Sequence, residues 1–281
     1  MNLLVRLILI ECIKMFSRWR TWIGFLILTI LIPLIIIAAH YSGMEQPLDN
    51  FGGGRFIRTG DLLNGWFFSY FILNTLWIHI PFLLTFAAGD LFAGEGAEGT
   101  WRLILVRPVS RAMLFWAKWL ANGVYTFALI FYMGAVTLIV GLLIEGTGDL
   151  FVVHPDLGMR IIEGKFVFWY LLRAYAIGAA TMLIISTLAL FFSVFVSNAI
   201  GPIIGAMGLM IIFFLIELLD FTLFKTIRPV LFTHYLDVWN TTFFTDVAPA
   251  YYVRALGVQL STLLILSFAA FFVFRRKEIL S

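Results

Sequence analysis

Charged residues are scarce in this 281-residue chain, and cysteine is nearly absent. Asp, Glu, Lys and Arg together make up 12% of the residues, about half the share that is usual in a water-soluble domain. Hydrophobic residues make up 62%, which predicts a polytopic membrane protein. The only cysteine, Cys12, has no partner for an internal disulfide and no Cys-x-x-Cys neighbour, so we expect neither an oxidised ectodomain nor a cysteine metal site.

Sequence motifs for catalysis are also missing. No Gly-x-x-x-x-Gly-Lys-Ser/Thr run occurs, so the chain is not expected to bind or hydrolyse ATP itself. Gly-x-Ser-x-Gly and His-Glu-x-x-His are absent, and the four histidines have no spacing typical of metal ligands. The net charge of +3 does not indicate nucleic-acid binding, because the basic residues lie at the ends of apolar runs. We therefore expect no enzyme activity, metal or cofactor in this chain.

Long apolar runs fill most of the sequence and predict one all-α membrane domain over residues 1–281. Helices are expected because a helix satisfies its own backbone hydrogen bonds in lipid, and no barrel-like alternation is present. The second run, at about 40 Å, is longer than the hydrocarbon layer, so we expect it to tilt or to project into water. The six predicted transmembrane helices are residues 22–41, 66–92, 114–144, 166–196, 200–221 and 251–274.

Two further segments are expected at the membrane surface. In residues 1–20 the charged side chains share one helical face opposite leucine and isoleucine, which predicts an amphipathic interfacial helix rather than a signal peptide. An early start to the first span is less favoured, because the charges would enter the bilayer at about 2.5 kcal/mol or more each. Residues 223–250 are too apolar for a free loop and predict an outer re-entrant or interfacial segment.

Lysine and arginine are concentrated on one side of this topology. They cluster in the first 20 residues, between the second and third spans, and after the last span, whereas the other loops mix them with acidic residues. The positive-inside rule therefore predicts that both termini and the connection after the second span are cytoplasmic.

That connection is a polar segment between two long apolar runs. Acidic residues and a Gly-Thr pair open it, as at a helix start or a short turn, since a helix N-terminus favours negative charge. An apolar stripe with helical spacing follows beside basic residues, and a proline ends the helix before Ser110, which is placed to cap the third span. We predict a short amphipathic helix over residues 95–107 that binds a partner. The candidate partner-binding residues are Glu95, Glu98, Gly99, Thr100, Trp101, Arg102, Ile104, Leu105, Arg107, Pro108 and Arg111.

The same segment carries a family resemblance. Its residues are Glu95, Gly99-Thr100, Leu103-Ile104-Leu105, Arg107-Pro108-Val109-Ser110-Arg111 and Lys118. This pattern resembles the coupling helix of type-2 ABC transporter permeases, in the branch with bacitracin-resistance, sodium-export and nitrous-oxide-reductase-maturation permeases. A second acidic residue, often found two positions after the first, is Ala97 here.

The resemblance implies the permease subunit of an ATP-driven exporter, working by alternating access in a prokaryotic cell membrane. It also implies the partners: two copies of a separate ATP-binding subunit, which would bind ATP and Mg, and a second permease copy, with a homodimer expected. Membrane lipid surrounds the whole assembly.

Polar residues inside the spans are costly in lipid and often functional. Asn74, Thr75 and His79 lie within about one and a half turns in the second span, where hydrogen bonding between helices is favoured over substrate contact. Glu217 and Asp220, near the outer end of the fifth span, either line an exit or lie at the interface.

Glycine spacing in the fifth span allows close approach of another helix. Gly201 and Gly205 form a Gly-x-x-x-Gly pair that Gly208 extends. Packing within one subunit and contact across the two-fold axis of a dimer are both open, and the family resemblance favours the dimer.

Three functions compete on the sequence alone. The favoured one is an exporter permease, and the second is an ATPase-independent secondary transporter or channel. The second would normally show buried charged pairs at mid-membrane or an internal repeat. The third is a non-transporting membrane relay for an ATPase, which would call for a large outer domain. No sequence feature identifies the substrate.

Overall fold

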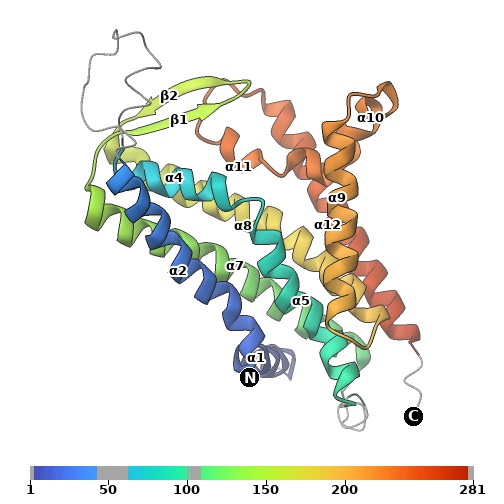
Figure 1. Ribbon diagram of the computed structural model, residues 1–281. Helices are drawn as coiled ribbons and strands as arrows, with labels where there is room; N and C mark the ends of the chain where they lie inside the picture. Colours follow the sequence, from blue (N-terminus) through green and yellow to red (C-terminus); the bar gives the residue numbers. More distant parts are fainter. Residues whose placement is uncertain (1–2, 43–62, 100, 102–108, 278–281) are drawn as a thin grey trace.

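The computed structural model of the protein describes residues 3–42, 63–99, 101 and 109–277. They form a helical bundle with one small β-hairpin (Figure 1). The longer helices are α1 (Leu3–Ser17), α2 (Trp19–Ser42), α4 (Gly65–Leu76), α5 (Ile80–Ala97), α7 (Arg111–Glu145), α8 (Gly164–Phe195), α9 (Ile200–Leu218) and α12 (Pro249–Arg276).

The architecture is that of a multi-pass membrane protein, as the sequence predicts. Within the described residues, α2, α7, α8, α9 and α12 are each long and apolar enough to cross a membrane. Helices α4 and α5 pass the same test only as a pair, which raises the number of candidate spans from five to six.

The second predicted span, residues 66–92, is not one continuous helix. It is broken between α4 and α5, whose axes are bent by 61°. Pro81 lies in the first turn of α5, and as a proline it cannot donate the backbone hydrogen bond that a continuing helix would require to Trp77. The break covers Trp77, Ile78 and His79, and the helix resumes at Ile80.

A β-hairpin departs from the all-α prediction. Strands β1 (Leu150–His154) and β2 (Gly158–Ile162) pair antiparallel, with Leu150 opposite Ile162. Gly158 has a φ of 82°, a conformation that glycine adopts without strain, and it closes the turn. A local sequence pattern indicates this hairpin, because β-branched residues flank a Pro-Asp turn. The hairpin is too short to be detected in a hydropathy profile.

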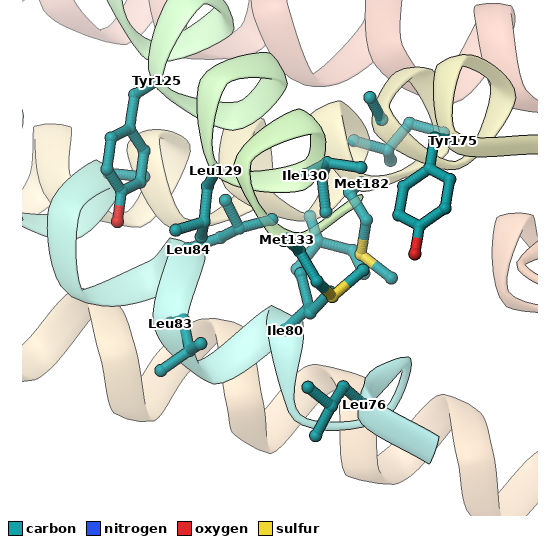
Figure 2. Packing of buried hydrophobic residues seen from close by; sticks show 14 of the residues in the cluster. Leu76, Ile80, Leu83, Leu84, Tyr125, Leu129, Ile130, Met133, Tyr175 and Met182 are labelled. Carbon is teal, nitrogen blue, oxygen red and sulfur yellow. The ribbon is translucent and has the colours of Figure 1, made fainter. Parts of the chain in front are cut away.

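Helix α8 forms the centre of the bundle. Of its apolar stretch 72% is buried, compared with 11% for α12, which lies at the periphery. Side chains of α5, α7 and α8 interdigitate in the core, including Leu84, Met133 and Met182 (Figure 2). Most of the remaining large apolar side chains point outward, as a lipid-facing surface requires.

The bundle has two distinct ends (Figure 1). Helix α1, the end of α5, the start of α7 and the end of α12 lie at one end, here called the termini end. The hairpin lies at the other, the hairpin end. The segments predicted to be cytoplasmic therefore share one end, while the side of the membrane on which that end lies stays a prediction.

Residues 223–250 fold as short helices at the hairpin end rather than as a free loop. The side chains of Trp239 and Phe243 are fully buried, and the Trp239 ring lies 5.3 Å from that of Trp77. The segment contains α10 (Thr222–Ile227), η1 (Arg228–Val230), η2 (Phe232–Tyr235) and α11 (Val238–Thr241).

Candidate functional site

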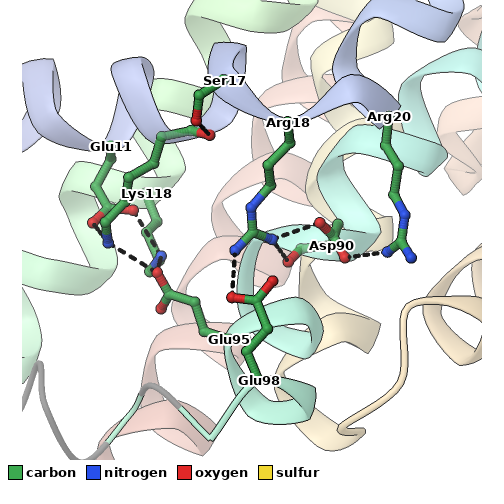
Figure 3. Close-up of polar contacts among 9 residues, drawn as sticks. Glu11, Ser17, Arg18, Arg20, Asp90, Glu95, Glu98 and Lys118 are labelled. Atoms are coloured by element: carbon green, nitrogen blue, oxygen red, sulfur yellow. Dashed lines mark hydrogen bonds and ion pairs between the residues drawn. The ribbon is translucent and has the colours of Figure 1, made fainter.

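A cluster of charged side chains at the termini end is the most distinctive polar site of the described residues (Figure 3). The acidic and basic members are equal in number, so the cluster is neutral when all are ionised. Its members come from α1, the junction after it, the start of α2, the end of α5 and α7. They are Glu11, Lys14, Arg18, Arg20, Asp90, Glu95, Glu98 and Lys118.

The amphipathic character of α1 brings part of this cluster together. Its charged face turns inward, where Glu11 is 3% exposed, whereas Ile13 on the opposite face is 69% exposed. Helix α1 ends at Ser17, and after one non-helical residue, Arg18, the chain continues as α2. Residues 3–17 are thus helical, and α1 packs its charges on α5 and α7; a position of this helix along the membrane surface stays a prediction.

Lys118 is the central cation of one half of the cluster. Its side chain is 1% exposed, and Nζ lies 2.7 Å from Glu11 Oε2 and 2.7 Å from Glu95 Oε1. Lys14 closes the arrangement from the surface side, with Nζ 2.7 Å from Glu11 and 3.0 Å from Glu95. Two lysines thus bridge the same two carboxylates, which joins α1, α5 and α7.

Aromatic rings border the buried ammonium. Nζ of Lys118 lies 5.6 Å from the centre of the Phe92 ring and 5.7 Å from that of Trp101, within the range of a cation–π interaction. Trp101 is 8% exposed, because its ring stacks on Phe92 and lies 5.3 Å from that of Phe274. The sequence predicts Trp101 as an outward anchor for a partner, but here it attaches the segment to its own bundle.

Asp90 is the central anion of the other half. Arg18 donates to Oδ2 at 2.5 Å, and Arg20 donates to Oδ1 at 2.7 Å. Arg18 also reaches the half-exposed Glu98 at 3.3 Å. Gly94 makes this geometry possible, because a Cβ at that position would lie 2.5 Å from Arg18 Nη1.

The ion pairs shift the pKa values of the groups outside the spans. Burial tends to raise the pKa of Glu11, but the charges and hydrogen bonds of Lys118 and Lys14 outweigh it, so this pKa is lowered. Burial tends to lower the pKa of Lys14, yet Glu11 and Glu95 raise it overall. Both groups are therefore held in their charged forms near neutral pH.

The position of Glu95 and Glu98 corrects the prediction of a helix start. Glu95 lies in the last turn of α5, and Glu98 is its C-terminal cap residue. A helix C-terminus disfavours negative charge, and the nearby Lys14, Lys118 and Arg18 offset this cost. Gly99, with a φ of 66°, ends α5 in the left-handed conformation typical of a residue just after a helix.

Beyond Gly99 only part of the predicted coupling helix can be placed. Ser110 caps α7 as predicted, since its hydroxyl accepts a hydrogen bond from Met113 N. Arg111 donates to the carbonyl oxygens of Arg275 and Lys277, and so joins the start of α7 to the end of α12. Outside the described residues lie Thr100, Arg102, Ile104, Leu105, Arg107 and Pro108.

The polar residues of the second span lie at its break. Asn74 and Thr75 belong to the last turn of α4, and His79 directly precedes α5. All three are exposed, and their hydrogen bonds are local: Asn74 donates to Tyr70 O, and a ring nitrogen of His79 lies 3.3 Å from Thr75 O. The hydrogen bonds between helices that we favoured for these residues are absent from the described residues.

The acidic residues at the end of α9 have basic neighbours. Glu217 lies 3.2 Å from His234 and 4.0 Å from Arg228, and Asp220 lies 2.9 Å from Lys225. These contacts tie α9 to the segment that follows it.

The glycines of α9 serve different purposes. A Cβ at Gly205 would lie 3.0 Å from the ring of Phe192 on α8, so this glycine permits packing within the chain. A Cβ at Gly201 would lie within 3.2 Å of Asn198 and Val196, whereas at Gly208 it would meet open space.

Sequence reasoning did not single out Asp90 or the pairing of Glu11 with Lys118. Asp90 was detectable as a lone acid in an apolar run, since such a residue needs a partner in lipid. The partners themselves are distant in sequence and emerge only from the fold. No group of three His, Cys, Asp or Glu that suits a metal ion occurs in the part of the chain that the structure describes.

Comparison with known proteins identifies the family. A family model described as ABC-2 family transporter protein matches residues 7–217, which is most of the chain and includes the whole cluster. No curated protein matches the sequence. Members of this family are multi-pass membrane components of ABC transporters and generally work with an ABC ATP-binding subunit. The chain belongs to the ABC-2 transporter family.

Proposed function

We propose that this chain is the permease subunit of an ATP-driven exporter, powered by two separate ATP-binding subunits that bind the segment between α5 and α7. The termini end would face the cytoplasm, and ATP and Mg would bind to the partner subunits. Family membership supports the transporter class, and the connections of this segment to the bundle support its role in coupling.

The attachment of the segment at both ends is the observation that carries the proposal. Before it, Glu95 and Glu98 are held by α1, α7 and Arg18. After it, Arg111 donates at 3.1 and 2.8 Å to two carbonyl oxygens at the end of α12. A force on the segment is therefore applied to several helices at once, because neither attachment is a free loop.

A second permease copy is part of the proposal. Asn74, Thr75 and His79 are exposed at the break of a membrane-embedded helix pair, where polar groups facing lipid are costly. A homodimer would cover such a face, with the open side of Gly208 as another region of close approach. Alternating access would then move the two copies relative to each other around a shared pathway.

The secondary-transporter alternative predicts charged pairs at mid-membrane. The cluster is buried, but it lies at the termini end, and Asp90 is only about two turns from the end of α5. This position fits a link to a cytoplasmic motor better than an ion site halfway across the bilayer.

The test begins with the ATP-binding subunit that co-purifies with the chain from native membranes. Glu98→Lys reverses a charge that is 56% exposed beside the proposed docking segment. Glu163→Lys is the matched control, because Glu163 is 68% exposed and directly precedes α8, next to the hairpin. We expect Glu98→Lys to weaken ATPase-subunit binding about tenfold, as interfacial charge changes do, with no effect of the control.

The measurement is the affinity of the purified subunits in detergent, together with ATPase stimulation in proteoliposomes. Equal affinity for wild type and both variants would contradict docking next to Glu98. Transport by the chain alone, with every ATPase subunit removed, would overturn the proposed function as a whole. Trp101→Asp is a poor test, because the buried Trp101 ring also packs the bundle.

A further inference from the structure

A cavity of about 260 Å³ lies at the hairpin end, away from the ion-pair cluster. It is formed where the segment after α9 meets the first turns of α12. Its walls are Pro229, His234, Tyr235, Ala250, Tyr251 and Arg254. The volume is just below the usual range for drug-sized ligands, which begins at about 300 Å³, so the cavity suits a small polar group.

Arg254 is the charged wall of this cavity. It is exposed on α12, a helix that crosses the membrane, and within the described part of the chain it has no hydrogen bond or ion pair. A guanidinium facing lipid without an anion is unfavourable by about 2.5–3.5 kcal/mol at the bilayer centre and by less towards the interface. Its depth in the membrane therefore decides what can contact it.

The spacing of the arginines in α12 gives that depth. Arg275 and Arg276 end the helix, where basic residues are typical of a membrane boundary. From Arg275 back to Arg254 the helix rises about 32 Å at 1.5 Å per residue. The hydrocarbon core is about 30 Å thick, so Arg254 lies at the opposite boundary, the level of the lipid phosphates.

The backbone adds positive potential at the same place. Ala250 and Tyr251 lie in the first turn of α12. The residue before the helix, Ala248, has no side chain that could cap it, Pro249 has no amide hydrogen, and the amide of Tyr251 donates to Ala248 O at 2.9 Å, which leaves the amide of Ala250. The first amide groups of a helix and its dipole favour an anion in this position.

Two acidic side chains near the cavity face other groups. Glu217 lies 3.2 Å from His234 and 4.0 Å from Arg228, and Asp237 lies 3.9 Å from His154. Neither acid makes an ion pair with Arg254. The cavity thus combines one arginine without an anionic partner, a helix N-terminus and tyrosine rings.

We propose that this cavity binds a phosphate-bearing group at the membrane boundary. Arg254 makes the charge-assisted contact, the amide of Ala250 at the start of α12 donates a hydrogen bond to a phosphate oxygen, and Tyr235 and Tyr251 pack against the uncharged remainder. The phosphate can belong to a lipid headgroup or be free in solution. This site does not depend on the ATPase or on the direction of transport.

The experiment compares wild type with Arg254→Gln in micelles of dodecyl maltoside, a detergent that carries no phosphate. One arm adds a small fraction of phosphatidylglycerol and counts the molecules retained per chain by native mass spectrometry. The other arm adds inorganic phosphate and measures thermal stabilisation. Lys165→Gln is the matched control, because Lys165 is an exposed cation in the first turn of α8 that is already paired with Glu163.

We expect about tenfold weaker retention of phosphatidylglycerol in Arg254→Gln, the effect of losing one hydrogen bond to a charged group, with Lys165→Gln unchanged. Arg254→Lys should keep part of the binding, and equal melting temperatures of the variants without added ligand establish that all are folded. Loss of phosphate stabilisation alone would identify free phosphate as the ligand. Equal results for wild type and Arg254→Gln in both arms would overturn the proposal.

Discussion

The variant Lys118→Met tests the ion-pair cluster most directly. Methionine replaces much of the apolar stem of Lys118 but removes its charge, so Glu11 and Glu95 lose the cation that lies 2.7 Å from each. Removing one partner from a buried pair costs about 3–5 kcal/mol, because the remaining charge is left in a poorly solvated place. Lys14 still contacts both carboxylates, so we expect the lower end of this range, about 3 kcal/mol.

A second substitution separates the effect of charge from that of packing. In Glu11→Gln/Lys118→Met the remaining ions, Lys14 and Glu95, can balance each other across 3.0 Å. The double variant should therefore be more stable than Lys118→Met alone, with a coupling of about 1–2 kcal/mol between the two sites. Lys165→Met is the control, because that pair is exposed and contributes at most about 1 kcal/mol.

The assay is thermal unfolding of the purified chain in one detergent. For a chain of about this size, 1 kcal/mol corresponds to roughly 2–4 °C, so Lys118→Met should lower Tm by roughly 6–12 °C and the control by no more than about 4 °C. A Tm of Lys118→Met within 2 °C of wild type, or a double variant no better than the single one, would refute the view that Lys118 neutralises two buried carboxylates.

Three further predictions follow from the same end of the molecule. Gly94→Ala should destabilise the chain by about 1–3 kcal/mol, because the added methyl group displaces Arg18 from Asp90. Gly257→Ala is the control: a methyl group there meets open space, so this variant should be as stable as wild type or slightly more stable. Thermal unfolding compares the two variants. Arg111→Gln should reduce transport per ATP, because the link to the end of α12 is lost; equal coupling ratios in proteoliposomes would contradict this. Because the pKa of Glu11 is lowered in the folded chain, its ionised form stabilises the fold above its ordinary pKa of 4.5, and this stabilisation is lost as the pH falls through the lowered pKa. The Tm of wild type should therefore exceed that of Glu11→Gln at neutral pH, and the difference should shrink below about pH 4. A difference in Tm that is unchanged in acid would contradict the ion pairs of Glu11.

Hydropathy predicted most of the long helices, because each segment that crosses lipid must be apolar and must satisfy its own backbone hydrogen bonds. The spans expected at 114–144 and 166–196 are observed as α7 and α8 with ends shifted by at most three residues. The second span was wrong as a continuous helix, although Pro81 marked the break, because hydropathy averages over a window and cannot detect one missing hydrogen bond.

The site was harder to predict than the fold. Charges in residues 1–20 predicted an amphipathic surface helix, but periodicity does not say whether its charged face meets water or protein. In the structure that face meets α5 and α7, and Glu11 finds Lys118 more than 100 positions along the chain. A carboxylate and a lysine that are each unfavourable in an apolar environment stabilise each other only when three helices meet, and no local pattern contains that information.

The cluster also bears on how a force at the termini end is transmitted. A buried ion pair is often no more stabilising than apolar side chains of the same volume, so the arrangement around Lys118 is poorly explained by stability alone. What apolar residues do not provide is a fixed relative position: two lysines that share two carboxylates, from three helices, tolerate little sliding before a buried charge loses its partner. Helices α1, α5 and α7 should therefore move as one unit, and a motor that acts on the segment after Glu98 would displace them together rather than bend one of them.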